Sequence, residues 1–147
     1  MEISVQEAPF NLADEINRFT GRQKNMGAIV TFSGIVRNNA LGDIQAMEIE
    51  YYPGMTESVL GEAANRSIER WSLGDVLIIH RYGQLCPGEL IMMIATAAAH
   101  RRDAFNAADY LMDFLKSRAP FWKKECKTDR TIWVEAKSKD EVDLKRW

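Results

Sequence analysis

The chain passes from a long helix into a β-strand over the stretch Leu115-Lys116-Ser117-Arg118-Ala119-Pro120-Phe121-Trp122-Lys123. The helix is predicted from about Arg101 to Arg118, because at 100° per residue its apolar side chains fall on one stripe. That stripe contains Ala104, Phe105, Ala108, Leu111, Met112 and Leu115. A short strand is predicted from Phe121 to Cys126. The stretch therefore indicates a helix that packs on a sheet and leads directly into another strand.

Positive charge is concentrated around this helix. Residues 100–127 contain seven Lys or Arg side chains and four acidic ones, a local excess of +3 in a chain whose formal net charge is −2. The rest of the chain therefore carries −5. Basic side chains that are interleaved with Phe and Trp in an otherwise acidic protein favour a pocket for a small anion over a general polyanion surface.

Two cations lie at apolar positions of the predicted helix. Lys116 falls about 20° from Phe105 and about 40° from Met112, at the edge of the apolar stripe, and Arg101 falls inside it. A lysine at such a position can snorkel, with its ammonium in water. A partly desolvated ammonium gives up its proton more easily, which suits a lysine that moves protons or acts as a nucleophile near neutral pH.

The remaining elements follow from the period of the apolar residues. Helices are predicted over Leu12 to Phe19, capped by Asn11, and from Thr56 to Trp71. The predicted strands are Met26 to Arg37, Met47 to Tyr51, Val76 to Tyr82, Leu90 to Ala98 and Thr131 to Ala136. With the two elements above, the order is αββαββαββ. This order predicts an α+β domain with helices packed on a mainly antiparallel sheet.

The composition is that of one compact domain over residues 1–147, with 46% hydrophobic and 27% charged residues. Cys86 and Cys126 match no metal-binding spacing, so two free thiols in a reducing cytoplasm are expected. The first residues lack the basic and apolar regions of a leader peptide, and no run of eighteen apolar residues occurs. Neither export nor membrane insertion is expected.

Five motifs together resemble a known family. They are Phe32-Ser33-Gly34-Ile35-Val36-Arg37-Asn38, Leu41-Gly42-Asp43, Tyr52-Pro53-Gly54-Met55-Thr56-Glu57, His100-Arg101 and the segment Leu115 to Glu125. The most specific is Lys-x-Arg-Ala-Pro-Phe-Trp-Lys, from Lys116 to Lys123. The chain resembles the catalytic, large subunit of molybdopterin synthase over nearly its whole length, down to Lys145-Arg146-Trp147.

The resemblance implies a reaction of molybdenum cofactor biosynthesis. That family converts cyclic pyranopterin monophosphate (precursor Z) into molybdopterin by inserting two dithiolene sulfurs. Each sulfur comes from the C-terminal Gly-Gly thiocarboxylate of a small ubiquitin-like subunit. The implied fold is an α/β hammerhead with an extra small antiparallel sheet. The implied assembly is a homodimer within a heterotetramer, with no metal or cofactor and no nucleic-acid or membrane partner.

The resemblance also implies the site residues. They are Phe32, Arg37, His100, Arg101, Met112, Lys116, Lys123 and, where the family has a variable basic residue, Lys137. A cyclic phosphate and a thiocarboxylate are both anions, so a site that excludes water needs several fixed cations to bring them together. Arg37, His100 and Arg101 are expected to hold the phosphate. Lys116 and Lys123 are expected to neutralise the thiocarboxylate or to move protons, and which lysine does which stays open.

Simpler interpretations exist for single residues. Arg37 can end a strand in solvent, and Lys123 and Lys124 can form a solvated edge. His100 can satisfy a helix N-terminus. The remaining candidates are expected to be structural: Phe121 and Trp122 in the core, His80 in an apolar strand, and Cys86 and Cys126 as inert thiols.

Two other classes of function fit parts of the pattern. A single-stranded RNA binder would use exposed aromatics beside Lys or Arg, but the chain is acidic overall and has no Arg-Gly-Phe-type strand motif. A non-catalytic adaptor for a ubiquitin-like protein would need a groove but not the cluster of cations. Thermal stabilisation by a cyclic pterin phosphate, by an oligonucleotide or by the small subunit alone distinguishes the three.

Overall fold

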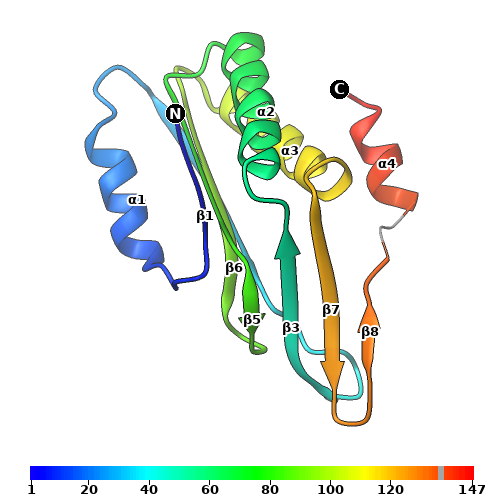
Figure 1. The fold of residues 1–147 in the computed structure, drawn as a ribbon. Helices are drawn as coiled ribbons and strands as arrows, with labels where there is room; N and C mark the ends of the chain where they lie inside the picture. The colour runs from blue at the N-terminus through cyan, green and yellow to red at the C-terminus, as the bar shows by residue number, and fades with distance from the viewer. Residues whose placement is uncertain (136–137) are drawn as a thin grey trace.

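The computed structural model describes residues 1–135 and 138–147. In chain order its elements are β1 (Glu2–Gln6), α1 (Leu12–Gly21), β2 (Ala28–Ile35), β3 (Ile44–Tyr51), α2 (Met55–Trp71), β4 (Asp75–Arg81), β5 (Gly83–Leu85), β6 (Leu90–Ala98), α3 (Arg101–Ser117), β7 (Phe121–Lys127), β8 (Thr131–Trp133) and α4 (Ser138–Leu144). Figure 1 shows their arrangement. Within the described residues, no helix is long and apolar enough to cross a membrane.

The main sheet has the strand order β1-β4-β6-β2. β1 runs parallel to β4, whereas β6 is antiparallel to both of its neighbours. Because successive side chains of a strand point to opposite faces, the fully buried strand β4 contributes to two cores. Val76 and Ile78 pack toward α2 and α3, while Leu77 and Ile79 pack toward α1. Figure 1 shows α1 on one side of this sheet and α2 with α3 on the other.

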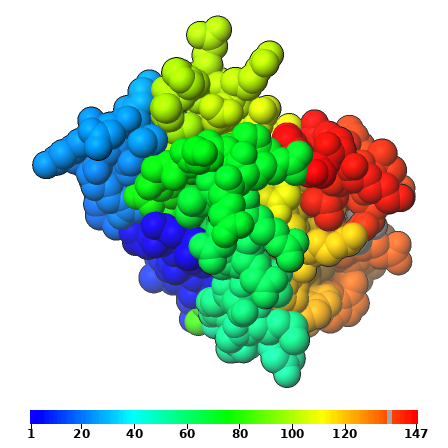
Figure 2. Space-filling view, turned by 90° about the horizontal axis from the view of Figure 1, so that it is seen from above, coloured from blue at the N-terminus to red at the C-terminus, as the bar shows by residue number. Residues whose placement is uncertain are grey.

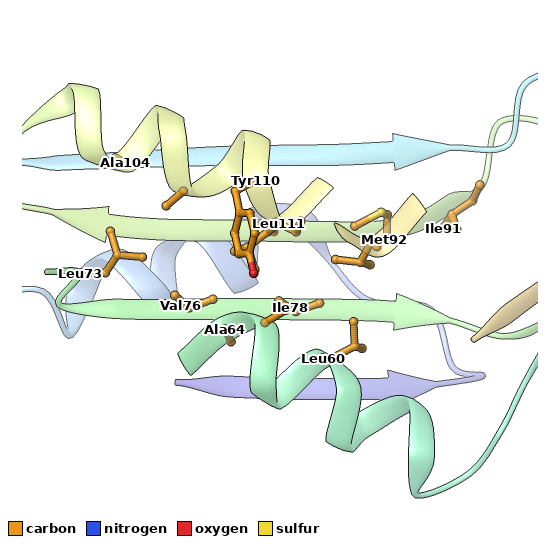
Figure 3. Close-up of a cluster of buried hydrophobic side chains, with 14 of the residues drawn as sticks. Leu60, Ala64, Leu73, Val76, Ile78, Ile91, Met92, Ala104, Tyr110 and Leu111 are labelled. Atoms are coloured by element: carbon orange, nitrogen blue, oxygen red, sulfur yellow. The ribbon is translucent and has the colours of Figure 1, made fainter. Parts of the chain in front are cut away.

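The larger core lies between the main sheet and the helices α2 and α3 (Figure 3). Leu60 and Ala64 of α2 and Ala104 and Leu111 of α3 are fully buried there. These positions recur at helical spacing, so each helix presents one apolar face to the sheet. The core therefore holds α3 firmly along its length and determines where its two ends lie.

The second sheet has the order β5-β3-β7-β8 and is antiparallel throughout. Its strand β7 follows α3 after only three residues, Arg118 to Pro120. The Thr56 hydroxyl at the start of α2 accepts a hydrogen bond from the Tyr52 amide (3.1 Å) and donates one to the Pro120 carbonyl (3.3 Å). This buried hydroxyl fixes the point at which the chain leaves α3 and enters the second sheet.

The fold class predicted from the sequence is confirmed, and so is the Asn11 cap, whose side chain accepts from the Ala13 and Asp14 amides. Three short elements were not predicted from the sequence: β1, β5 and α4. The helix α4 has no buried residue, so it carries no apolar period to detect. The strand predicted over Thr131 to Ala136 was too long, since β8 ends at Trp133 and Ala136 lies outside the described residues.

Two aromatic residues expected in the core are exposed. Phe105 is 61% exposed, because the buried face of α3 extends from Ala104 toward Ala107 and Tyr110, on the side away from Phe105. Trp122 is 47% exposed, because it points to the face of β7 opposite to Phe121. Phe121 itself is half-buried. Arg101 was also expected within the apolar stripe, but it is exposed.

Candidate functional site

A cavity of about 340 Å³ opens where the end of α3, the start of β7 and the edge of the main sheet meet. Its wall is drawn from both sheets and from two helices. The lining residues are Phe32, Gly34, His80, Ile91, Met92, Met112, Leu115, Lys116, Ala119, Phe121, Lys123, Val134, Glu135 and Asp140. Four of the residues expected at the site, Phe32, Met112, Lys116 and Lys123, are therefore brought together here.

The two lysines reach the cavity from different elements. Lys116 is in the last turn of α3, and Lys123 is the third residue of β7. The short connection between these elements folds the chain back, so that both side chains face one space. The backbone of Lys123 is held from both sides, by pairing with Ile49 of β3 and by the Val134 amide, which donates to its carbonyl at 2.8 Å.

Charge and burial act together on Lys123. Burial lowers the pKa of Lys123 from its ordinary value, and the positive charge of Lys116 lowers it further. The Asp140 carboxylate opposes these two effects. Lys116 is exposed, and no hydrogen bond or ion pair joins either ammonium to another described residue. Two cations are thus held side by side and remain available to an anionic ligand.

The helix α4 supplies the acidic side of the cavity. The Ser117 hydroxyl donates to the Asp140 carbonyl at 2.8 Å, and Arg118 forms an ion pair with Glu141. These contacts tie α4 to the end of α3, twenty-three residues away in sequence. Asp140 and Glu135 were missed in the sequence, since a surface carboxylate in a polar segment gives no sign of which distant lysine it will approach.

The remaining wall is apolar and closely fitted. Phe32 extends from β2 and Met112 from α3. Gly34 leaves room in this wall, because a Cβ at that position would come within 3.2 Å of the Met92 side chain. An apolar wall beside two ammonium groups lowers the local dielectric and strengthens their attraction for an anion.

Two other lysines of the basic segment are engaged elsewhere. The Lys124 ammonium contacts Glu50 at 2.6 Å and lies 4.3 Å from the ring centre of Trp133, on the face of β7 opposite to Lys123. Lys127 pairs with Asp43 at 3.5 Å. Both ammonium groups are therefore held in ion pairs outside the cavity.

His100 and Arg101 lie far from this cavity, at the opposite end of α3. Both are exposed and border an open hollow of about 520 Å³ with Arg102, Phe105 and Asn106. In Figure 2 the yellow-green segment near residue 100 projects from the surface at the top of the view. His100 occupies the N-cap position of α3, but its side chain makes no capping hydrogen bond.

Arg37 lies at the cavity end of the main sheet. It follows β2, whose last residue, Ile35, pairs with Leu90, whereas the first residue of β2 pairs with Ala98 just before His100. The nine residues of β6 separate these ends by about 27 Å. One chain alone therefore does not join Arg37 to His100 and Arg101. Lys137 lies outside the described residues.

Comparisons with known proteins agree on one family. The sequence model of the MoaE protein family matches residues 5–118. A molybdopterin synthase catalytic subunit of Cereibacter sphaeroides is 53% identical over 147 residues, which is 100% of both chains.

Two solved structures share the fold. The molybdopterin biosynthesis MoaE protein of Burkholderia ambifaria is 44% identical, covers 100% of this chain and 98% of its own, and has a TM-score of 0.84. A molybdopterin synthase structure from Staphylococcus aureus is 30% identical, with coverage of 90% and 96% and a TM-score of 0.82. With the paired lysines, the apolar wall and these full-length matches, the chain belongs to the MoaE family of molybdopterin synthase catalytic subunits.

Proposed function

We propose that this chain converts cyclic pyranopterin monophosphate into molybdopterin, with two sulfurs taken from the C-terminal thiocarboxylate of a small ubiquitin-like subunit. The observation that carries the proposal is the cavity that holds Lys116 and Lys123 against Phe32 and Met112. Each sulfur transfer forms a carbon–sulfur bond on the pterin side chain, from which an oxygen leaves, and water then breaks the carbon–sulfur bond of the donor and leaves the donor as a carboxylate. Membership of the family supports this assignment.

The two lysines of the cavity act through their positive charge. The thiocarboxylate tail enters the cavity as an anion, and Lys116 and Lys123 neutralise it together with the charge that develops on the attacked carbon. The lowered pKa of Lys123 also makes its ammonium a better proton donor than that of an ordinary lysine, because burial weakens its hold on the proton. A Gly-Gly end suits this site, since a tail without side chains can lie closely against the apolar wall.

We infer that the working unit contains two copies of this chain, with His100 and Arg101 of one copy completing the site of the other. The support is the open edge of the main sheet at β2, where Thr31, Phe32 and Ser33 are all exposed. Three consecutive exposed residues leave both faces of that strand uncovered, which is unusual for a long edge strand.

Antiparallel contact between the two β2 edges would bring the required ends together. Around a twofold axis, the Ala28 end of one strand meets the Ile35 end of the other. The Ala28 end lies beside the start of α3, and the Ile35 end lies beside the cavity. His100 and Arg101 of one copy then approach Arg37, Lys116 and Lys123 of the other. In this arrangement Arg37, His100 and Arg101 can bind the phosphate together. Each such dimer binds one small subunit at either end.

The decisive experiment is reconstitution. The purified chain is mixed with the cyclic pterin substrate, and dithiolene product is measured with and without the thiocarboxylated small subunit. Turnover is expected only with the thiocarboxylate, because Cys86 and Cys126 are free thiols and cannot renew a sulfur once it has been transferred. Equal sulfur transfer from free sulfide, or from Cys86 or Cys126, would refute the proposal. The matched controls are the Cys86→Ala and Cys126→Ala variants, which are expected to keep full activity.

We further propose that residues 1–147 act as one domain in the cytoplasm. The cavity takes its wall from both sheets, so neither sheet carries the site without the other. The free thiols of Cys86 and Cys126 fit a reducing compartment.

A further inference from the structure

His80 lies deep in the main sheet and reaches the same cavity. It is the sixth residue of β4, is only 3% exposed, and belongs to the residues that line the cavity. The sequence analysis assigned it a purely structural role. Among the described residues, one of its two ring nitrogens has a hydrogen-bond partner, and the other is left for a role in the site.

The hydrogen bonding of the ring identifies that nitrogen. Nδ1 lies 2.8 Å from the carbonyl oxygen of Arg81, which can only accept a hydrogen bond. Nδ1 therefore carries the hydrogen, and Nε2 of the neutral ring presents a lone pair. Burial, with a smaller effect of the Lys123 charge, lowers the pKa of His80 to about 3, so the ring stays neutral at working pH.

The ring is also coupled to β7. It stacks on Phe121, with ring centres 3.8 Å apart and planes inclined by 17°. Phe121 and Lys123 are two residues apart on one strand, so their side chains leave β7 on the same face. His80 thus packs against the face of β7 from which the Lys123 side chain extends. The positive charge of Lys123 acts on the ring and lowers its pKa.

The Lys123 ammonium needs an acceptor in this setting. The charged groups that face the cavity are Lys116, Lys123, Glu135 and Asp140, and no hydrogen bond joins the Lys123 ammonium to a described residue. A half-buried ammonium next to a second cation gains most from an acceptor that is close and does not take its proton. A neutral imidazole nitrogen has both properties.

We propose that His80 is a positioning residue: when the flexible Lys123 side chain turns toward the ring, Nε2 accepts a hydrogen bond from its ammonium and so directs it at the thiocarboxylate and pterin. The proposal rests on the proposed function, in which Lys123 is a catalytic residue. His80 touches no reacting atom, so its effect on rate passes through Lys123 alone.

Two substitutions separate positioning from packing. His80→Phe keeps an aromatic ring against Phe121 but removes the acceptor, whereas His80→Gln loses the stacked ring but can place an amide oxygen near the position of Nε2. We expect kcat to fall on the order of 10- to 100-fold in His80→Phe, with KM for the pterin nearly unchanged, and to recover partly in His80→Gln. A structural role predicts the reverse order, with the Phe variant more active than the Gln variant.

The control is Ile79→Val, which perturbs β4 on the face toward α1. It is expected to lower stability slightly and to leave kcat unchanged. A double-mutant cycle completes the kinetic test: in the Lys123→Ala background, His80→Phe should cause no further loss, and an undiminished loss would overturn the proposal.

A measurement without turnover keeps this proposal separate from the proposed function. Nitrogen NMR of the wild-type protein at pH 7 is expected to show His80 as a neutral ring with the hydrogen on Nδ1. It should also show a Lys123 ammonium resonance that shifts in His80→Phe. A hydrogen on Nε2, or a Lys123 resonance that does not change, would overturn the positioning role even if the wild-type enzyme is active. Wild-type inactivity in the reconstituted reaction would refute the proposed function instead.

Discussion

Arg101 and Lys116 lie at opposite ends of α3, at its first residue and in its last turn. Fifteen residues of helix separate them by about 22 Å along the axis. One small pterin phosphate is too short to contact both from the same chain. If both are functional, each site must be built from two chains.

Complementation tests this geometry. His100→Ala and Lys116→Ala should each be inactive alone. When the two variants are mixed and allowed to exchange subunits, about half of the dimers become mixed and each has one intact site, so activity should recover to about a quarter of wild type. Product formation is measured alongside native mass spectrometry, which verifies exchange. Exchange without recovery would show that each site belongs to a single chain.

A second prediction concerns the four lysines of the basic segment. Lys116→Ala and Lys123→Ala should each lower kcat/KM on the order of 100- to 1,000-fold, or roughly 3 to 4 kcal/mol, because they remove fixed positive charge from the cavity. Lys124→Ala and Lys127→Ala are the matched controls, since their ammonium groups pair with Glu50 and Asp43. Melting temperatures should stay nearly unchanged for the first pair. Equal losses in all four variants would mean that the segment is only a charged surface.

A third prediction follows from the neutral, buried His80. Its pKa is about 3 in the folded protein and about 6.5 when unfolded, so between these values the unfolded chain binds the extra proton. The free energy of unfolding should therefore fall as the pH drops below about 6.5. The His80 contribution to this loss is about 2 kcal/mol at pH 5.

Urea unfolding at pH 7 and pH 5 measures this effect. The wild-type protein should lose more stability between the two values than His80→Phe, which has no group to protonate at that position. The comparison cancels the carboxylates, which titrate in both proteins. Parallel pH dependences would show that the ring is not held neutral.

A fourth prediction concerns the attachment of the C-terminal segment. The buried Asp113 carboxylate of α3 accepts hydrogen bonds from Arg146 (2.8 Å) and from the Trp147 indole (2.7 Å). Asp113→Ala should lower stability by about 1 to 3 kcal/mol, because it removes these charge-assisted bonds, and should reduce activity, because α4 carries Asp140. Asp109→Ala is the control: Asp109 also pairs with Arg146 but is about half exposed, so little change is expected. Thermal unfolding and product formation measure both effects.

The sequence by itself determined the fold class, with helices packed on a mainly antiparallel sheet, and the four cavity residues Phe32, Met112, Lys116 and Lys123. Apolar residues at helical spacing defined α2 and α3, and β6, in which Thr96 is the one polar residue, could be recognised at its observed bounds, Leu90–Ala98. These signals are local, because burial of a helix or strand face requires a period of 3.6 or 2 in the residues themselves. The segment from Lys116 to Lys123 likewise contains both lysines of the cavity.

Only the tertiary structure decided which groups share that cavity. His80 and Asp140 come from a central strand and from a polar helix, and neither has a local pattern that relates it to Lys123. The stack of His80 on Phe121 and the bond from Ser117 to Asp140 join residues far apart in sequence. Such contacts depend on how the two sheets and α4 pack together. The periodic pattern of the sequence indicates which side chains are buried. Only the packing of the elements determines which other residues they contact.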